Sequence, residues 1–261
     1  MIGAIIGDIV GSRFEFNNHR STQFNLFTNE SKFTDDTVCT IAVADWILNV
    51  NMWEPSERGN FAHLMQGWCR RFPVGNYGLG FRKWINNPVP YNSYGNGAAM
   101  RISSIGYFFA PSSKLIYASD FVTSVSHDHP EGLKGARVIA EAGSMAWRGA
   151  TKAQIRAFIS ELGYDLNITC DSIRASNLFD ETCQVTVPQA LVCFLESTDF
   201  ESSIRLAVSI GGDSDTIAAI AGGLAEAFYK EIPESMIAEA QMRLPHEMLA
   251  VVDKFYLKKP K

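Results

Sequence analysis

Apolar residues recur at intervals of three and four over most of this chain, and this periodicity is the feature that most constrains its fold. Such a stripe gives a helix one face to bury. Runs that alternate apolar and polar residues, which would predict strands, are nearly absent. We therefore expect an all-α protein. The stripes cover residues 59–71, 133–147, 152–162, 187–196, 201–210, 216–230 and 234–243.

The length and composition predict one domain. The chain has 261 residues, of which 46% are hydrophobic and 20% charged, so it has ample material for a single core. No repeat, linker or low-complexity tract divides it. We expect a compact single-domain orthogonal helical bundle over residues 1–261, with loops at 73–78, 86–97 and 167–186, where turn-forming residues gather.

Several classes of protein are disfavoured. The formal net charge of -5 gives no electrostatic reason to expect nucleic-acid binding. The first ten residues are apolar but have no basic leader and contain Asp8, which predicts a buried helix rather than a signal peptide. No apolar run approaches membrane-spanning length. The five cysteines are scattered and lack a CxxC spacing, so we expect reduced core residues in a cytoplasmic protein.

An acidic turn precedes the stripe that begins at residue 216. The turn, Ser209-Ile210-Gly211-Gly212-Asp213-Ser214-Asp215-Thr216, carries two carboxylates and several hydroxyls. Asp213 or Ser214 could cap the helix that follows, but a cap needs only one such oxygen. Clustered hard oxygen ligands suit Mg²⁺ or Mn²⁺. A metal site and an over-supplied helix cap both remain open for this turn alone.

A second cluster with the same chemistry lies near the start of the chain. Thr34-Asp35-Asp36-Thr37 also opens a helical stripe. If the two helix ends meet, four carboxylates come together, and they repel one another unless cations neutralise them. Two divalent ions would do so almost fully. The pair of clusters therefore predicts a two-metal site.

The glycine spacing in the first predicted helix indicates close packing against another helix. Gly3, Gly7 and Gly11 recur every four residues, which lets another helix approach closely. Glu15 lies at the far end of this helix. From the pattern alone, Glu15 is either a solvated helix-end carboxylate or a functional group.

Two further segments are candidates for ligand contact. Tyr94-Gly95-Asn96-Gly97 turns into a helix through Met100 and Arg101, and such a turn presents free N–H groups to phosphate or sugar oxygens. A tight turn with a left-handed Asn would look the same. Ser126-His127-Asp128-His129 carries an HxH spacing, but no Cys or His partner completes a zinc site. Capping is the commoner role for such a histidine, and His129 has no assignable function.

Taken together, these motifs resemble the ADP-ribosylglycohydrolase family. The resemblance runs from Gly3 to about Phe228, and the paired Asp/Thr clusters are its most specific part. The matching segments are Gly7-Asp8 through Glu15, Phe33 to Thr37, Gly95-Asn96-Gly97 with Met100-Arg101, Ser126-His127, and Gly211 to Thr216.

The resemblance implies an all-helical domain with two Mg²⁺ ions in a cleft, Mn²⁺ being a possible substitute. It implies a catalytic role for Glu15, together with Asp35 and Asp213. The implied metal ligands are Thr34, Asp35, Asp36, Asp213, Asp215 and Thr216. The implied contacts to ADP-ribose come from Ser93, Tyr94, Gly95, Asn96, Gly97, Met100 and His127.

The implied activity is metal-dependent hydrolysis of the glycosidic bond between ADP-ribose and an acceptor, which reverses mono-ADP-ribosylation. The expected partner is an ADP-ribosylated protein or a small ADP-ribose conjugate; a nucleic acid enters only as a modified acceptor. The acceptor itself stays open. Two alternatives remain: an ADP-ribose-binding module without useful catalysis, and a two-metal hydrolase of phosphoanhydrides or phosphoesters.

Overall fold

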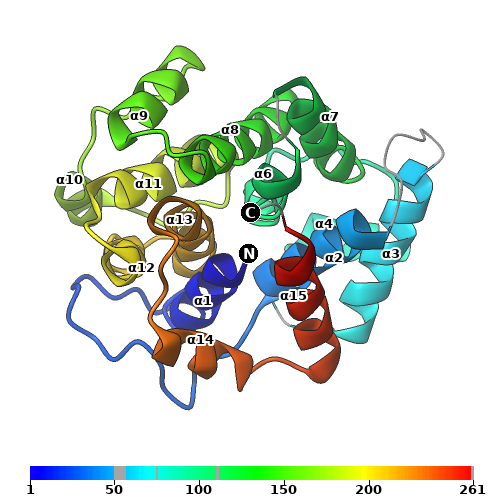
Figure 1. Ribbon diagram of the computed structural model, residues 1–261, viewed down its shortest axis with the longest axis horizontal. Coiled ribbons are helices and arrows are strands. Elements are labelled where there is room, and N and C mark those ends of the chain that lie inside the picture. Colours follow the sequence, from blue (N-terminus) through cyan, green and yellow to red (C-terminus); the bar gives the residue numbers. More distant parts are fainter. Residues whose placement is uncertain (50–56, 75, 110–111, 260–261) are drawn as a thin grey trace.

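The computed structural model describes residues 1–49, 57–74, 76–109 and 112–259. Within these ranges the chain forms 15 helices and no strand, which confirms the all-α prediction (Figure 1). Gly75, in the predicted loop 73–78, lies outside the described residues. The helices are α1 (Ile2–Gly11), α2 (Asp35–Asn49), α3 (Glu57–Arg71), α4 (Leu79–Asn86), α5 (Gly97–Met100), α6 (Ile105–Phe108), α7 (Ser112–Thr123), α8 (Pro130–Trp147), α9 (Lys152–Glu161), α10 (Cys170–Ser176), α11 (Cys183–Glu196), α12 (Phe200–Ser209), α13 (Ser214–Tyr229), α14 (Glu234–Gln241) and α15 (His246–Lys258).

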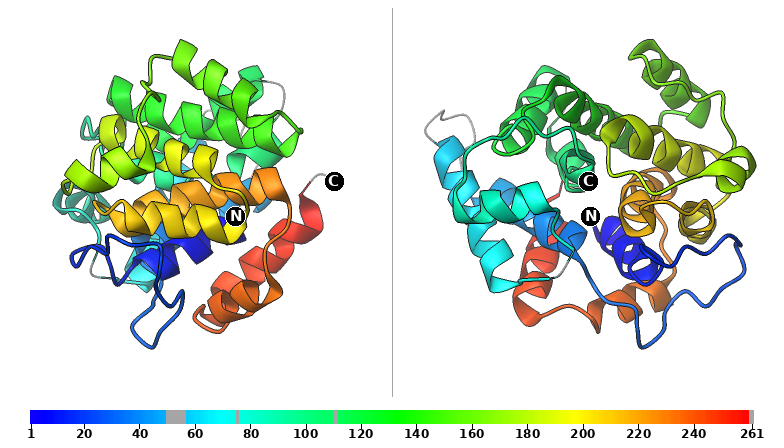
Figure 2. Two further views of the ribbon diagram at one scale, coloured as in Figure 1. Left: turned by 90° about the vertical axis from the view of Figure 1, so that its left-hand side faces the viewer. Right: turned by 180° about the vertical axis from the view of Figure 1, so that it is seen from behind.

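Helices α1 and α13 lie side by side at the centre of the fold (Figures 1 and 2). All residues of α1 are buried, as expected for a helix that is apolar on every side. The two helices run antiparallel, because Gly3 lies against Gly222 and Gly11 lies against Asp215. The C-terminal end of α1 therefore meets the N-terminal end of α13.

The glycines of α1 make this contact possible. A Cβ atom added to Gly7 would lie 2.0 Å from the carbonyl oxygen of Ala218. One added to Gly3 would lie 2.4 Å from the carbonyl oxygen of Gly222, and one added to Gly11 would lie 2.5 Å from the Cα of Asp215. No side chain fits at such distances. The four-residue glycine spacing thus allows the close helix approach that the sequence predicted.

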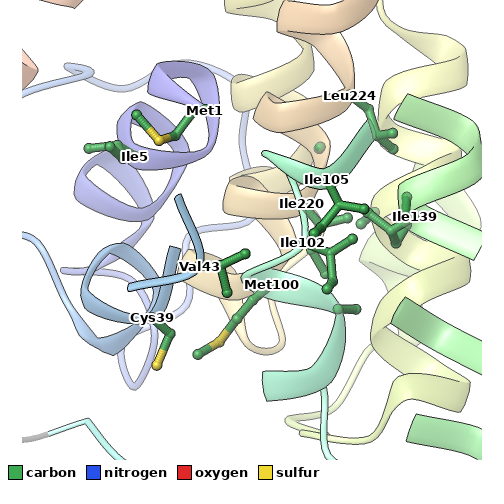
Figure 3. Close-up of a cluster of buried hydrophobic side chains, with 14 of the residues drawn as sticks. Met1, Ile5, Cys39, Val43, Met100, Ile102, Ile105, Ile139, Ile220 and Leu224 are labelled. Carbon is green, nitrogen blue, oxygen red and sulfur yellow. The ribbon is translucent and has the colours of Figure 1, made fainter. Parts of the chain in front are cut away.

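Other helices surround this central pair. Helices α8, α11 and α12 pack on α13, and α2 packs on α1. Figure 3 shows buried side chains from several helices of the core, among them Ile5 of α1, Val43 of α2 and Ile220 of α13. Each fully buried side chain of this size stabilises the fold by roughly 1.5–3 kcal/mol. The core therefore fixes α1, α2 and α13 relative to one another.

Two expectations from composition concern the cysteines and the membrane. All five cysteines are free and buried, as expected for reduced core residues. Among the described helices, none combines the length and the apolar character that crossing a bilayer demands.

The prediction of a loop over residues 167–186 is partly wrong. It contains α10, and α11 begins at Cys183 rather than at residue 187. The turn-forming residues here are helix caps: Thr169 and Ser172 form a capping box at the start of α10. Such residues mark a helix start as well as a loop, and the pattern does not separate the two.

Two longer helices fall outside the predicted stripes. In α7, Ile116 and Tyr117 are more than one-third exposed, so apolar residues occupy more than one face and blur the periodicity. In α15, Met248, Val251 and Phe255 are buried at regular spacing, but the equally apolar Leu257 is exposed.

The glycine contact predicts a sharp difference between two substitutions. Gly7→Ala should lower the free energy of unfolding by about 1–3 kcal/mol or more, because the new methyl group overlaps the backbone of α13. Gly67→Ala is the matched control, since Gly67 lies on the exposed side of α3 with open space around it. This control should raise stability by up to about 1 kcal/mol. Urea denaturation of both variants measures the difference, and equal stabilities would contradict the proposed contact.

Candidate active site

Five carboxylates meet where the end of α1 faces the starts of α2 and α13. One oxygen from each of Asp8, Asp36 and Asp215 lies within 4.8 Å of the others. Glu15, Asp213 and Asp215 form a second group by the same measure. Asp215 belongs to both groups. The two acidic clusters predicted from the sequence are therefore adjacent, because Asp36 of one lies beside Asp215 of the other.

Asp8 is a member that the sequence did not predict. Its carboxylate accepts hydrogen bonds from the backbone N–H of Thr34 (2.9 Å) and of Thr37 (3.1 Å), and from both threonine hydroxyls. Asp8 thus caps α2 from another helix and satisfies amides that a helix start leaves unpaired. The available signal was a lone carboxylate in a helix that is otherwise apolar on every side, because a buried charge needs partners.

The residues of the Thr34–Asp36 cluster take different positions in the site. Asp36 is 2% exposed, and it accepts a hydrogen bond from the hydroxyl of Thr216 at 3.1 Å. Its other oxygen is buried without any hydrogen-bond partner. Asp35 is half-buried and lines the adjacent cavity but belongs to neither carboxylate group. Thr34 is fully buried, and its hydroxyl is directed at Asp8.

Asp213 does not act as a simple helix cap. It occupies the N-cap position of α13 but makes no side-chain capping hydrogen bond. Instead its carboxylate accepts a hydrogen bond from the Asn96 amide at 2.6 Å. Asn96 also donates to the hydroxyl of Thr186 at 3.0 Å, so both hydrogens of this amide are used within the protein. The interpretation of the turn as an over-supplied cap is therefore wrong.

Glu15 is buried, which excludes a solvated helix-end carboxylate. It lies beyond the end of α1, in the turn that follows Gly11, and is only 6% exposed. The side-chain amide of Asn76 donates a hydrogen bond to one of its oxygens. Glu15 also lines the cavity that opens beside the carboxylates.

Burial and mutual repulsion raise the pKa values of these carboxyl groups. Burial, with the charge of Asp213, raises the pKa of Glu15 to about 7. Burial raises the pKa of Asp8 to about 6 although its hydrogen bonds oppose the change. The pKa values of Asp36 and Asp215 lie well above their ordinary range for the same two reasons. A cluster of this kind favours protons or cations.

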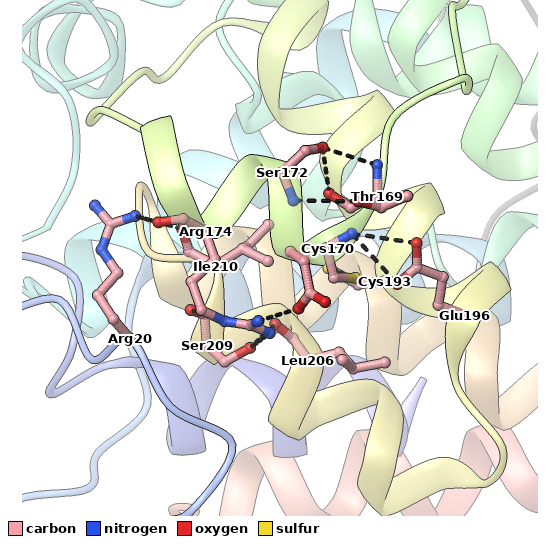
Figure 4. Close-up of polar contacts among 11 residues, drawn as sticks. Arg20, Thr169, Cys170, Ser172, Arg174, Cys193, Glu196, Leu206, Ser209 and Ile210 are labelled. Atoms are coloured by element: carbon pink, nitrogen blue, oxygen red, sulfur yellow. Dashed lines mark hydrogen bonds and ion pairs between the residues drawn. The ribbon is translucent and has the colours of Figure 1, made fainter.

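Side chains from two distant segments hold the turn before Asp213. Arg174 of α10 donates from Nε to the carbonyl oxygen of Ser209 at 3.1 Å. Arg20, in the long segment between α1 and α2, donates to the carbonyl oxygens of Ile210 (2.9 Å) and Arg174 (2.8 Å) (Figure 4). Carbonyls at helix C-termini carry partial negative charge, so these cations are well placed.

The two glycines of the turn are held in the same way. Gly211 and Gly212 have φ angles of 70° and 78°, which favour glycine. Asn177 donates to the carbonyl oxygen of Gly211 at 3.0 Å. Asn18 exchanges two hydrogen bonds of 2.8 Å with the backbone of Gly212. Four successive carbonyls are thus engaged by side chains, and the direction of Asp213 is fixed.

A cavity of about 360 Å³ opens beside the carboxylates. Of the seven residues predicted to contact a ligand, six line it. They are Ser93, Gly95, Asn96, Gly97, Met100 and His127. Asn96 has a φ of -64°, so the alternative of a left-handed Asn turn is wrong.

Tyr94 is the exception. It is 47% exposed and lies outside the cavity lining, with its ring against that of His129 at 5.2 Å. His129 itself caps α8, because its Nδ1 accepts a hydrogen bond from the backbone N–H of Glu131 at 3.1 Å. No role for His129 followed from the sequence, and the structure shows that it caps a helix.

Several cavity residues were not predicted. Asn76, Phe81, Tyr91, Arg101 and Glu181 all line the cavity. They come from separate loops and helices, and only the fold brings them together. Arg101 was visible at the end of the glycine-flanked turn, but nothing in the sequence indicated its direction.

The chain matches known proteins over nearly its whole length. Residues 1–260 match the family model described as ADP-ribosylglycohydrolase. ADP-ribosylhydrolase ARH3 of Mus musculus is 24% identical over 90% of this chain and 84% of its own length. ADP-ribosylarginine hydrolase Tri1 of Pseudomonas putida (strain GB-1) is 26% identical over 88% and 69%. A solved structure, "ADP-ribosylglycohydrolase-related protein complex", aligns with a TM-score of 0.74 at 24% identity, covering 98% of this chain and 95% of that chain.

The raised pKa values predict how stability depends on pH. A carboxyl group whose pKa is higher in the folded state binds its proton more tightly there than in the unfolded chain. The folded state therefore loses stability as the pH rises from about 4, the ordinary pKa, through the folded values of about 6 for Asp8 and about 7 for Glu15. In chelator, the melting temperature should be higher at pH 5.5 than at pH 8. Added Mg²⁺ should raise it most at pH 8.

Asp36→Asn tests the cause of this effect. Removing one buried charge should raise the melting temperature in chelator at pH 8 by about 2–4 °C for each kcal/mol gained, and should reduce the stabilisation by Mg²⁺. Asp253→Asn, on the exposed side of α15, is the control and should change neither. A lower melting temperature for Asp36→Asn in chelator would contradict the role of repulsion.

Proposed function

Because this chain belongs to the ADP-ribosylglycohydrolase family, we propose that it hydrolyses the glycosidic bond between ADP-ribose and an acceptor and so reverses mono-ADP-ribosylation. The observation that carries the proposal is the convergence of Glu15 with the carboxylates of α1, α2 and α13 beside one cavity. Family membership supports an ADP-ribosyl hydrolase. The metal, the roles of individual residues and the acceptor are the proposed parts.

The residues present fit divalent cations. Five carboxylates and two threonine hydroxyls supply hard oxygen donors, and the unpartnered buried oxygen of Asp36 lacks any other means of compensation. We assign two Mg²⁺ ions to this site, with Mn²⁺ as a substitute. When bound, such ions polarise the sugar oxygens and neutralise the cluster. The proposed ligands are Thr34, Asp35, Asp36, Asp213, Asp215 and Thr216. Asp8 is added to this set as a residue that supports the ligands.

Glu15 is the proposed general base. Asn76 holds one of its oxygens, and the carboxylate takes the proton of the attacking water. The glycosidic bond breaks through an oxocarbenium-like state, and nearby carboxylates stabilise the positive charge that develops on the sugar. Asn96 keeps Asp213 in place by its hydrogen bond of 2.6 Å. The Gly95–Gly97 turn provides the surface against which the nucleotide part lies.

Among acceptors, charge at the cavity mouth favours arginine. Glu181 is exposed and lines the cavity without belonging to the carboxylate groups. A guanidinium pairs with carboxylates, whereas a serine-linked ADP-ribose offers no cation. The similarity to a protein named ADP-ribosylarginine hydrolase points the same way.

The first expected result is release of free ADP-ribose from arginine-modified protein, faster than from serine-modified protein. Release should require Mg²⁺, stop with chelator, and be lost in Asp213→Ala. Chromatography of the products measures it. AMP or inorganic phosphate as product would instead identify a phosphoanhydride or phosphoester hydrolase. Metal-dependent binding of ADP-ribose without any product would identify a binding module.

Glu15→Gln should separate catalysis from binding. Loss of a general base typically lowers turnover by roughly 10²- to 10⁴-fold, while the Kd for ADP-ribose should change little because the amide keeps the shape of the side chain. Glu161→Gln, exposed in α9, is the control and should retain full turnover. A Glu15→Gln enzyme that keeps most of its turnover would remove Glu15 from the mechanism.

A further inference from the structure

Arg101 is a buried cation without an anionic partner. It is 0% exposed, and no carboxylate of the described residues lies within ion-pairing distance of its guanidinium. Its contacts are neutral: Met65 Sδ at 3.3 Å, Ser126 Oγ at 2.8 Å and His127 Nδ1 at 3.0 Å. Within the described residues, the Nε of Arg101 has no hydrogen-bond partner. Burying an unpaired charge costs free energy. We therefore expect a ligand site nearby in which this charge has a function.

The contact with His127 determines where that imidazole carries its hydrogen. A guanidinium has five N–H donors and no acceptor. At 3.0 Å from the Arg101 nitrogen, Nδ1 of His127 must therefore accept. The hydroxyl of Ser126, 2.8 Å from the same Nδ1, is then a further donor to it. In the neutral ring, the hydrogen must be on Nε2.

The surroundings also keep the ring neutral. His127 is 4% exposed, and the rings of Tyr91 and Phe81 lie 5.9 Å and 6.2 Å from it. Burial and the positive charge of Arg101 hold the pKa of His127 well below its usual range. The neutral form with hydrogen on Nε2 is thus the form present at physiological pH.

The Nε2–H group faces the glycine turn of the cavity. A Cβ atom added to Gly97 would lie 3.0 Å from Nε2, and one added to Gly95 would lie 3.6 Å from it. Within the described residues, Nε2 has no hydrogen-bond acceptor. A buried donor of this kind is left for a ligand. The two glycines leave room for a ligand atom to reach it.

We propose that Arg101 is a positioning residue for substrate: it fixes His127 as a neutral Nε2–H donor to a phosphate oxygen of ADP-ribose at the Gly95–Gly97 turn. The inference rests on the proposed function and adds the residue that prepares the site before substrate arrives. The positive charge of the guanidinium also compensates part of the negative charge of the diphosphate. Arg101 itself does not touch the substrate.

Nitrogen-15 NMR of the histidine rings tests the first half of the proposal without any substrate. The His127 signals, assigned with a His127→Gln variant, should show hydrogen on Nε2 and no titration between pH 8 and pH 5.5. Arg101→Met removes a donor that keeps hydrogen off Nδ1 and should populate the tautomer with hydrogen on Nδ1, whereas Arg101→Gln, whose amide still donates, should keep the Nε2 tautomer. Hydrogen on Nδ1 in the wild type, or an ordinary titration, would overturn the proposal.

Binding and kinetics test the second half. Loss of a charge-assisted contact predicts roughly a 10- to 100-fold rise in the Kd for ADP-ribose and in KM for Arg101→Met, with a much smaller change in kcat. Arg101→Gln should fall between this variant and the wild type. Arg148→Met, at the exposed arginine that follows α8, is the control for loss of one arginine. Circular dichroism establishes that each variant is folded.

The outcomes separate this inference from the proposed function. A folded Arg101→Met variant with unchanged Kd would overturn the role of Arg101, even if the wild type releases ADP-ribose. If Arg101→Met does not fold, Arg101→Gln and the wild-type tautomer decide the question. A wild type with the expected tautomer that binds no ADP-ribose in Mg²⁺ would overturn both the ligand assignment and the proposed function.

Discussion

The close contact between α1 and α13 is the constraint on which the site depends. Three glycines of α1 let the two backbones touch, and the antiparallel direction brings the end of α1 to the start of α13. Asp8 and Asp215 are therefore carried to the same point by packing alone. The hydrophobic burial of both helices stabilises an arrangement that electrostatics opposes. A separate loop could not hold repelling carboxylates so close, because it lacks the buried area to offset the repulsion.

Structural and chemical roles overlap within this cluster. Asp8 caps α2 and also lies within reach of Asp36 and Asp215. Asn96 orients Asp213 while lining the cavity. Arg101 contacts His127 rather than an acid. The cavity is thus lined both by the carboxylates and by His127 beside the Gly95–Gly97 turn.

Much of the fold and part of the site followed from the sequence. Helical periodicity identified α3, α8, α9 and α11 to α14, because each buries a regular face. The motifs at 34–37 and 209–216 identified acidic helix starts. The sequence did not predict Asp8, whose role depends on which helix start lies beside it. It placed Tyr94 among the ligand contacts, although this residue lies outside the cavity lining. Arg101 and Asn76 were also missed, since their direction is set by tertiary contacts and no local pattern encodes it.

The segments that hold the turn before Asp213 combine two kinds of residue. Asn18 and Asn177 point inward and bind backbone carbonyls, whereas Phe16 and Phe179, each two positions away, are 79% and 44% exposed. The inward residues bind main-chain atoms, so they hold the turn whatever rings stand beside them. The outer rings can therefore change without loosening the turn, while the inner amides keep the direction of Asp213.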